Sequence, residues 1–335
     1  MRFGLAYDFR NPAQWALPWR DLYAGTLDQM VFAEQLGFDS IWIGEQHLAE
    51  DGALPSPLSI AAAIAARTSR IRIGVCVPAL PLHNAVSLAE QIAVLDQLSG
   101  GRIELGLGDD GFAAEFAAFG VPRRQRAARF REAVQVLRLL FSGERISFKG
   151  RFYDLDGLTL APPPLQAGGP PLWGGAISAK QALRAAALRL HLLPRGDRRA
   201  TLDIWARALG RFGHDPEAFR VLVNRPVVVT DDPLRMWQRL RPGEEYRASL
   251  DARRTEEAGV PRGSPVQTDD SQALPLLDGQ YLLGSAARVR DEIDAYRERV
   301  PVTDLVGWGV PLGLRPDEMY PSLERFAREV MPRFL

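Results

Sequence analysis

The most informative part of the chain reads Gly37-Phe38-Asp39-Ser40-Ile41-Trp42-Ile43-Gly44-Glu45-Gln46-His47. Its apolar centre, Ser40–Ile43, has the pattern of a short β-strand, and a helical pattern precedes it at about residues 22–36. Three polar residues, Glu45, Gln46 and His47, follow the strand directly. In a parallel α/β barrel, the carboxyl ends of the strands form the rim where catalytic groups gather. We therefore expect this strand to deliver its polar residues to such a rim.

Strand-like runs alternate with helical periodicity from one end of the chain to the other. The expected strands are Arg2–Tyr7, Ser40–Ile43, Ile71–Val75, Ile103–Leu107, Leu172–Gly175, Leu190–Leu193, Val221–Val229 and Val302–Val306. The stripe Leu88, Ile92 and Leu95 is typical of the helices expected between them. About eight such units, with no break in composition, predict one domain over residues 1–335 that folds as a (β/α)₈ TIM barrel. A large doubly wound sheet is the alternative that the pattern leaves open.

Two segments interrupt this repeat. Residues 142–166 are rich in glycine, proline and aromatic residues, which predicts a hairpin-like insertion. Residues 231–279 form a long, charged, proline-containing segment. Loops of this length in compact domains are usually functional or mobile, so we expect a mobile loop at the rim. A final helix is expected to carry Met319, Leu323, Phe326 and Val330 on one face.

The composition excludes several classes of protein. A formal net charge of zero offers no basic field for nucleic acid or for an anionic membrane. The chain has one cysteine, Cys76, which rules out an internal disulfide framework and fits a reducing compartment. Residues 1–10 contain Asp8 and no signal-peptide core, and no apolar run reaches the roughly 18 residues of a membrane helix. A cytoplasmic location is therefore expected.

Short motifs give two further indications. Gly106–Gly111 matches G-x-G-x-x-G after a strand, but it lies in the fourth unit, and Asp109 and Asp110 would repel a pyrophosphate. A dinucleotide site is therefore not favoured. The four histidines have no metal-ligand spacing along the chain, so no metal is predicted. His47 is either a structural histidine or, because it follows a strand at the rim, a group that exchanges protons.

Several stretches together resemble the bacterial-luciferase-like family of flavin-dependent oxidoreductases. They are Tyr7–Pro12, Gly37–His47, Ser56-Pro57, Ile64–Gly74, Leu80–His83, Ala89–Gln91, Leu95–Arg102, Phe119–Val121 and Leu283–Ser285 with Val289. The resemblance spans nearly the whole chain. It implies a barrel whose rim holds FMN, or a deazaflavin coenzyme in some branches, usually in a dimer. In the oxygen-using members, reduced FMN and O₂ oxidise a small organic substrate.

The resemblance also implies roles for individual residues. Val75, Cys76 and Val77 match the strand end where the family often has a non-proline cis peptide beneath the flavin ring. Gly108 belongs to the matching stretch after the fourth strand. The expected phosphate-binding residues are Gly174, Gly175, Ala176 and Ser178 in a strand-to-helix turn and Arg126 in a preceding helix. Arg129, in the same helix as Arg126, is a second candidate.

The chain departs from the family pattern at several of these positions. Gln46 stands where the family has the first of two histidines, so His47 becomes the main candidate for proton transfer, with Gln46 beside it. Asp109 and Asp110 replace a loop that bears glycine and arginine, and Ala127 replaces an arginine. Arg189 stands where relatives commonly have glycine.

Three functions are therefore considered. The first is a monooxygenase that uses reduced FMN and O₂, with a separate flavin reductase because no nicotinamide site is evident. The second is a deazaflavin-dependent oxidoreductase that transfers hydride. The third is a degenerate, non-catalytic subunit with weak flavin binding or none. The expected assembly is a homodimer or a heterodimer with a related subunit, through the helices around Ala61–Ala66 and Leu88–Leu98.

Overall fold

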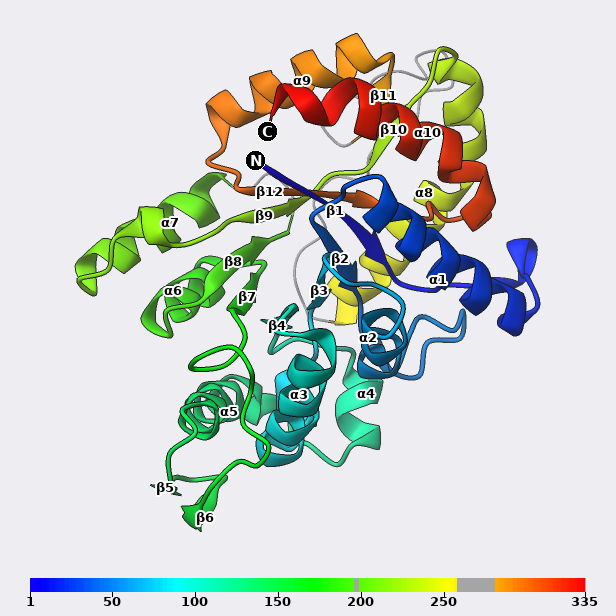
Figure 1. The fold of residues 1–335 in the computed structure, drawn as a ribbon. Helices are drawn as coiled ribbons and strands as arrows, with labels where there is room; N and C mark the ends of the chain where they lie inside the picture. The colour runs from blue at the N-terminus through cyan, green and yellow to red at the C-terminus, as the bar shows by residue number, and fades with distance from the viewer. Residues whose placement is uncertain (196–198, 258–280, 335) are drawn as a thin grey trace.

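Eight parallel strands form the wall of a barrel in the computed structural model (Figure 1), which describes residues 1–195, 199–257 and 281–334. In their order around the ring, the strands are β8 (His191–Pro194), β7 (Leu172–Ala176), β4 (Ile103–Leu107), β3 (Arg72–Val75), β2 (Ser40–Ile43), β1 (Arg2–Tyr7), β12 (Asp304–Trp308) and β9 (Leu222–Asn224). A parallel bridge between Leu192 and Val221 brings the two ends of this order together. The ring is nearly closed, so the predicted TIM barrel is confirmed and the open doubly wound sheet is excluded.

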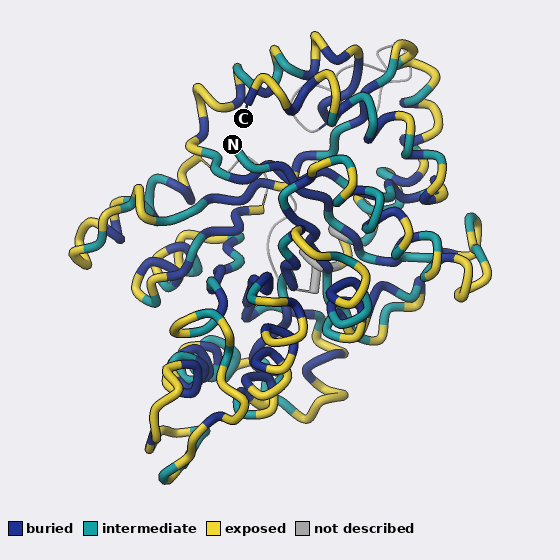
Figure 2. Tube along the Cα trace, in the orientation of Figure 1, coloured by how far each residue is buried: buried dark blue, intermediate teal, exposed yellow. Residues whose placement is uncertain are grey.

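Helices surround the wall (Figure 1). They are α1 (Trp19–Gln35), α2 (Pro57–Ala65), α3 (Ala85–Ser99), α4 (Ala113–Ala118), α5 (Arg126–Phe141), α6 (Ala179–Ala187), α7 (Arg199–Arg211), α8 (Pro233–Glu257), α9 (Ala286–Arg299) and α10 (Tyr320–Arg325). A π-helical turn, Phe326–Val330, extends α10 and completes the expected final helix. Figure 2 shows buried positions along the strands and exposed positions on the outer turns of the helices. Among the described residues, no helix is long and apolar enough to cross a membrane.

Alternation along the strands divides the core into two parts. On β2, Ile41 and Ile43 belong to the large cluster between wall and helices, whereas Trp42 joins a separate cluster inside the barrel with Trp173. The two indole rings meet edge to face, with centroids 5.4 Å apart. Gly74 makes room for Trp42, because a Cβ at Gly74 would lie 2.2 Å from the indole. Because side chains alternate along each strand, every second one points into the barrel, and large side chains fill its interior.

Paired charges occupy the amino-terminal end of the barrel. Glu104, fully buried, pairs with Arg72 and with Arg220, whose Nη1 lies 2.9 Å from Glu104 Oε1. Trp173 Nε1 donates to Glu104 Oε2 at 2.7 Å, and Asp304 pairs with the other side of Arg220. Burial opposes ionisation of Glu104, but Arg220 and Arg72 outweigh it and lower the pKa of Glu104. At the end opposite the rim, these buried carboxylates are therefore all paired with arginines, in what we call the ionic layer.

The strand expected at Val221–Val229 is instead divided in two. β9 pairs with β12 in the barrel wall, whereas β10 (Val227–Val229) pairs with β11 (Leu282–Gly284) in a separate two-stranded sheet. The break falls at Pro226, which has no N–H to donate to a neighbouring strand. The carbonyl of Pro226 instead accepts from Leu282 N at 2.8 Å, so the chain changes partner at that residue.

The two segments that interrupt the repeat behave differently. Residues 142–166 contain the antiparallel pair β5 (Ile146–Lys149) and β6 (Asp154–Leu158), as the hairpin prediction requires. The loop expected at 231–279 is wrong over its first half, because Pro233–Glu257 is the single helix α8 with Pro242 inside it. The remainder, from 258, lies outside the described residues. The loop was predicted from the length, charge and proline content of the segment, and Pro242, which usually ends a helix, lies inside this one.

Candidate functional site

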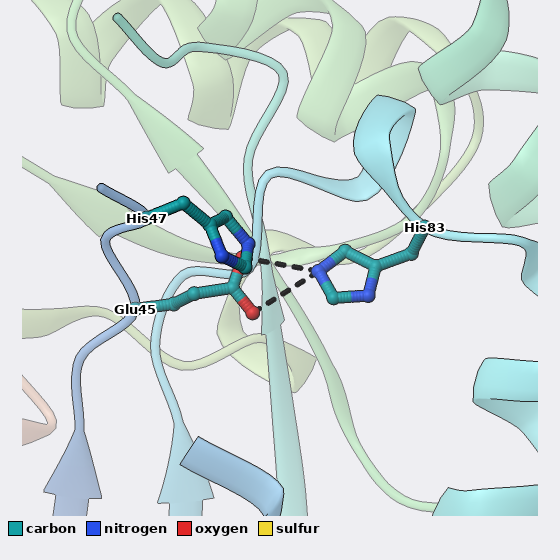
Figure 3. Close-up of side chains that lie close together, drawn as sticks. All are labelled: Glu45, His47 and His83. Atoms are coloured by element: carbon teal, nitrogen blue, oxygen red, sulfur yellow. Dashed lines mark hydrogen bonds and ion pairs between the residues drawn. The ribbon is translucent and has the colours of Figure 1, made fainter. Parts of the chain in front are cut away.

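Three side chains meet at the carboxyl-terminal rim of the barrel (Figure 3). Glu45 and His47 follow β2, and His83 follows a short 3₁₀ turn, Leu80–Leu82, in the loop after β3. His83 Nε2 lies 3.0 Å from both carboxylate oxygens of Glu45, and His47 Nε2 lies 3.4 Å from Glu45 Oε1. One nitrogen or oxygen from each residue lies within 4.8 Å of the other two. The rim therefore holds a compact carboxylate with two imidazoles.

Neighbouring backbone fixes this cluster in place. Ala79 N donates to Glu45 Oε1 at 3.0 Å, which orients the carboxylate toward the histidines. His47 N donates to Glu115 Oε1 at 2.8 Å, and the other oxygen of Glu115 accepts from Phe112 N at the start of α4. Glu115 thus ties the end of β2 to the loop after β4. The position of the cluster depends on three neighbouring strands.

The carboxylate and the imidazoles of this cluster stabilise each other's charged forms. Burial opposes ionisation of Glu45, but the two histidines outweigh it and hold the pKa of Glu45 at about 2. The Glu45 carboxylate in turn raises the pKa of His47, because it stabilises the imidazolium. Nε2 of His47 is buried, and no donor or acceptor of the described chain makes a hydrogen bond to it. His47 can therefore hold or release a proton at Nε2 toward a bound molecule.

Gln46, the second predicted catalytic residue, is engaged elsewhere. Its Oε1 accepts from Arg10 Nη2 at 2.5 Å, and Arg10 also contacts Asp51 and Asp8. Gln46 N donates to the carbonyl of Leu54 at 2.9 Å. The glutamine thus links the end of β2 to the loop after β1, and its side-chain oxygen is already bound.

The residues expected beneath a flavin ring divide into two groups. The peptide bond Cys76–Val77 is cis, as the resemblance predicts for this strand end. A Cβ built at Gly108 would lie 3.2 Å from Val77, and one at Gly175 would lie 3.4 Å from it, so both glycines lie against Val77 with no side chain between; these three residues are called the cradle below. Val75, by contrast, packs in the cluster that faces the helices. Burial raises the pKa of Cys76 to about 12, so its side chain is a neutral thiol.

The cradle fits a planar apolar ring system. Its floor is the barrel-interior cluster of Trp42, Trp173, Leu193, Leu222 and Val306, against which Cys76 and Val77 pack. A side chain at Gly108 or Gly175 would narrow the space above Val77. The residues present therefore fit the ring of a flavin-type cofactor.

The turn expected to bind phosphate has its donors engaged within the protein. Ser178 caps α6, and Gln181 Oε1 accepts from Ile177 N at 2.9 Å and from Ser178 Oγ at 3.1 Å. Asp109 is buried here, 2.9 Å from Gln181 Nε2 and 2.7 Å from Arg184 Nη2. A phosphate would have to replace Asp109 as the partner of these donors.

The other expected phosphate residues make contacts within the protein. Arg126 Nη1 donates to the carbonyl of Arg123 at 3.3 Å, and Arg129 Nε donates to Gln125 within the same helical segment. Gly174 and Ala176 face outward against α6 and the helix-facing core, so only their backbone could serve a ligand. Of the residues predicted here, Gly175 and Ser178 have the most direct access to the rim.

Helix α8 reaches across the rim on the side of β1 and β12. Arg247 Nη1 lies 2.7 Å from Asp8 Oδ2, and its guanidinium lies 3.9 Å from the centroid of the Trp308 ring. Tyr246 Oη donates to Asp51 Oδ2 at 3.1 Å. The segment expected to cover the site thus contacts the rim as a helix.

Sequence comparisons agree with this geometry. A family model described as luciferase-like monooxygenase matches residues 1–303. The oxygenase component of a flavin-dependent trigonelline monooxygenase from Acinetobacter baylyi is 24% identical over 94% of this chain and 91% of its own length. An F420-dependent glucose-6-phosphate dehydrogenase from Kineococcus radiotolerans is 39% identical over 43% of this chain and 46% of its own length. Uncharacterized protein y4vJ of Sinorhizobium fredii is 32% identical over 48% of this chain, and the chain spans 46%, about half, of that protein.

Structural comparison supports the same assignment at the level of the fold. The oxygenating constituent of 3,6-diketocamphane monooxygenase from Pseudomonas putida, in complex with FMN, superposes with a TM-score of 0.80. It is 21% identical, and the match covers 100% of this chain and 99% of that chain. The relatives in these comparisons are named as monooxygenases and dehydrogenases. The chain belongs to the luciferase-like monooxygenase family.

Proposed function

We propose that this chain is the oxygenase of a two-component flavin-dependent monooxygenase, which uses reduced FMN and O₂ to oxidise a small organic substrate. The observation that carries the proposal is His47, whose buried Nε2 lies at the rim, 3.4 Å from the Glu45 carboxylate and without a well-formed hydrogen bond to the described residues (Figure 3). The relative matched over nearly its whole length is named as an oxygenase component. That name supports a separate reductase for this chain.

Each part of the rim has a distinct task in this proposal. Bound reduced FMN supplies the electrons that activate O₂. Val77, Gly108 and Gly175 hold its ring, and the apolar floor excludes water from that face. His47 gives or takes a proton at Nε2, while Glu45 keeps the imidazole oriented. Helix α8 closes the side of the rim that carries Asp8 and Trp308.

A pair of variants at position 47 tests the proposal. Proton-transfer groups contribute about 10²–10⁴-fold in rate, so His47→Ala and His47→Gln should lower kcat by that order. Affinity for reduced FMN, measured by anaerobic titration, should change by less than about threefold, because the ring rests on other residues. His214→Ala is the matched control, since His214 lies beyond α7 and away from the rim. Unchanged turnover in both His47 variants would remove the histidine from the mechanism.

A deazaflavin-dependent hydride transfer is the second candidate. Asp109 pairs with Gln181 and Arg184 beside the turn expected to bind phosphate, and this acidic group departs from the pattern expected for FMN. The F420-dependent relatives make a deazaflavin a reasonable alternative. Parallel titrations with reduced FMN and with the deazaflavin separate the two. Binding of the deazaflavin alone would replace the first proposal with the second, and failure of both to bind would support the non-catalytic subunit.

We also propose a dimer and a cytoplasmic location. Val94 and Leu98 on α3 are exposed apolar residues, on a helix that the family resemblance places in a dimer. Light scattering at micromolar concentration should give twice the monomer mass of 37.1 kDa. A monomer would contradict the proposed assembly without affecting the proposed chemistry.

A further inference from the structure

We infer that Glu45, His47 and His83 form a binding site for a divalent first-row transition ion of the zinc type. The inference goes beyond the proposed function, because it concerns the three side chains themselves and needs no flavin. An ion on His47 Nε2 would block proton transfer by that atom while it is bound, so the metal-bound chain should be inactive in turnover. Two imidazoles and one carboxylate are a ligand set that suits zinc, cobalt, nickel and iron. The three groups come from two neighbouring loops and point toward one another (Figure 3).

The distances match those of a coordination shell. Zinc bonds to imidazole nitrogen and carboxylate oxygen at about 2.0–2.2 Å, which places neighbouring ligand atoms of a tetrahedron about 3.4 Å apart. Glu45 Oε1 lies 3.4 Å from His47 Nε2 and 3.0 Å from His83 Nε2. An ion at their centre would therefore need side-chain adjustments of tenths of an ångström. A sequence reading could not find this set, because 36 residues separate His47 from His83.

The environment of His47 Nε2 is a further observation, because its ion-pair partner Glu45 lies 3.4 Å away, too far for a well-formed hydrogen bond. His47 Nε2 is buried, and nothing in the described residues makes a hydrogen bond to it, although it faces the Glu45 carboxylate. A buried polar atom left without a partner costs about 1–3 kcal/mol, so such an atom in a native protein calls for an explanation. An ion bound to Nε2 supplies the missing partner. Nε2 of His83, which now makes a hydrogen bond to Glu45, would bind the same ion instead.

The surroundings have the support that metal ligands require. Ala79 N holds Glu45 Oε1 at 3.0 Å, and Glu115 holds the backbone of His47. The ring of Phe119 lies 4.6 Å from the His47 ring and limits its rotation. Ligands fixed by such outer contacts bind metals about 10- to 100-fold more tightly than loosely held ones. With three protein ligands and a partly accessible His83, a fourth position is left for water, as in catalytic zinc sites.

Cobalt and zinc titrations of the untagged, flavin-free chain test the inference. We expect one equivalent of Co²⁺ to bind with a visible d–d absorption, and Zn²⁺ to displace it stoichiometrically. His83→Ala, His83→Gln and Glu45→Gln should each weaken binding at least 10-fold, whereas His214→Gln should bind like the unmodified chain. Circular dichroism confirms that each variant is folded.

Two outcomes would overturn the inference. One is the absence of stoichiometric binding by the unmodified chain. The other is equal binding by the unmodified chain and the folded His83 and Glu45 variants, which would place the ion on adventitious surface groups. Neither outcome bears on flavin binding or turnover, so failure here is distinguishable from failure of the proposed monooxygenase.

Discussion

Two helical glycines provide a matched test of how α8 rests on the rim. A Cβ at Gly243 in α8 would lie 2.0 Å from the backbone oxygen of Leu312, in the loop after β12. A Cβ at Gly210 in α7 would meet nothing within 4 Å. The same substitution, glycine to alanine, should therefore have opposite signs at the two positions.

The magnitudes follow from the geometry. Real Cβ contacts essentially never fall below 3.0 Å, so Gly243→Ala must move α8 or Leu312 by about 1 Å. Overpacking costs about 1–3 kcal/mol, and the upper part of that range applies because both surfaces are backbone. In a helix interior, alanine is about 1 kcal/mol more favourable than glycine, which offsets part of this cost. Gly243→Ala should therefore lower the free energy of unfolding by about 1–2 kcal/mol, whereas Gly210→Ala should raise it by about 0.5–1 kcal/mol.

The same displacement has a functional consequence. Moving α8 away by 1 Å would lengthen the Arg247–Asp8 contact, now 2.7 Å, and the Tyr246–Asp51 hydrogen bond, now 3.1 Å, beyond bonding distance. We expect faster amide hydrogen exchange in α8 and a higher KM in Gly243→Ala alone. Guanidinium unfolding and exchange mass spectrometry measure both effects. Equal stabilisation by the two substitutions would show that α8 does not rest on Leu312.

Two further predictions concern the amino-terminal end of the barrel. Glu104→Gln removes the buried countercharge of Arg72 and Arg220, and it should lower the free energy of unfolding by about 3–5 kcal/mol in urea at pH 7; a loss below 1 kcal/mol would contradict the paired ionic layer. Burial, with Arg220 nearby, lowers the pKa of His191 from 6.5 to about 4, so the unfolded chain binds the extra proton between these values. His191 should therefore contribute up to about 3 kcal/mol of stability above pH 6.5 that is lost as pH falls toward 4. His191→Asn keeps an acceptor for Arg220 N, now 3.0 Å from Nδ1, and it should flatten that dependence; an unchanged pH profile would assign the dependence to other groups.

The barrel could be predicted because its strands and helices have strong local patterns. Ser40–Ile43 and Ile103–Leu107 are strands with the expected bounds. The divided strand at Pro226 shows where local patterns fail, because the apolar run continues although the pairing partner changes. Helix α8 shows the reverse case. It continues through Pro242 and Gly243, a pair unfavourable in an isolated helix, at the point where Gly243 lies close to the backbone of Leu312.

The candidate site could be predicted only in part. His47 and Gln46 were predicted as catalytic residues, with Glu45 beside them, because they follow a strand end, which a barrel places at its rim. His83 was not among the predicted site residues, yet its Nε2 lies 3.0 Å from Glu45 because β2 and β3 are neighbours in the ring. The order of the strands in the barrel determines that these two residues meet, and their spacing along the sequence does not reveal it. Asp109 was expected to oppose a phosphate, and its partners Gln181 and Arg184 became visible only in three dimensions.

The distribution of hydrogen bonds within the barrel separates stability from function. At the amino-terminal end, Glu104 and Asp304 are buried and fully paired with arginines. At the carboxyl-terminal end, Nε2 of His47 and both Nε and Nη2 of Arg247 are buried without hydrogen bonds to any described residue. Each buried polar group without a hydrogen bond lowers the stability of the fold by about 1–3 kcal/mol unless a ligand forms that bond. A ligand bound at the rim would supply partners for these atoms, whereas Glu104 and Asp304 already have theirs, so we expect small molecules to bind at the rim.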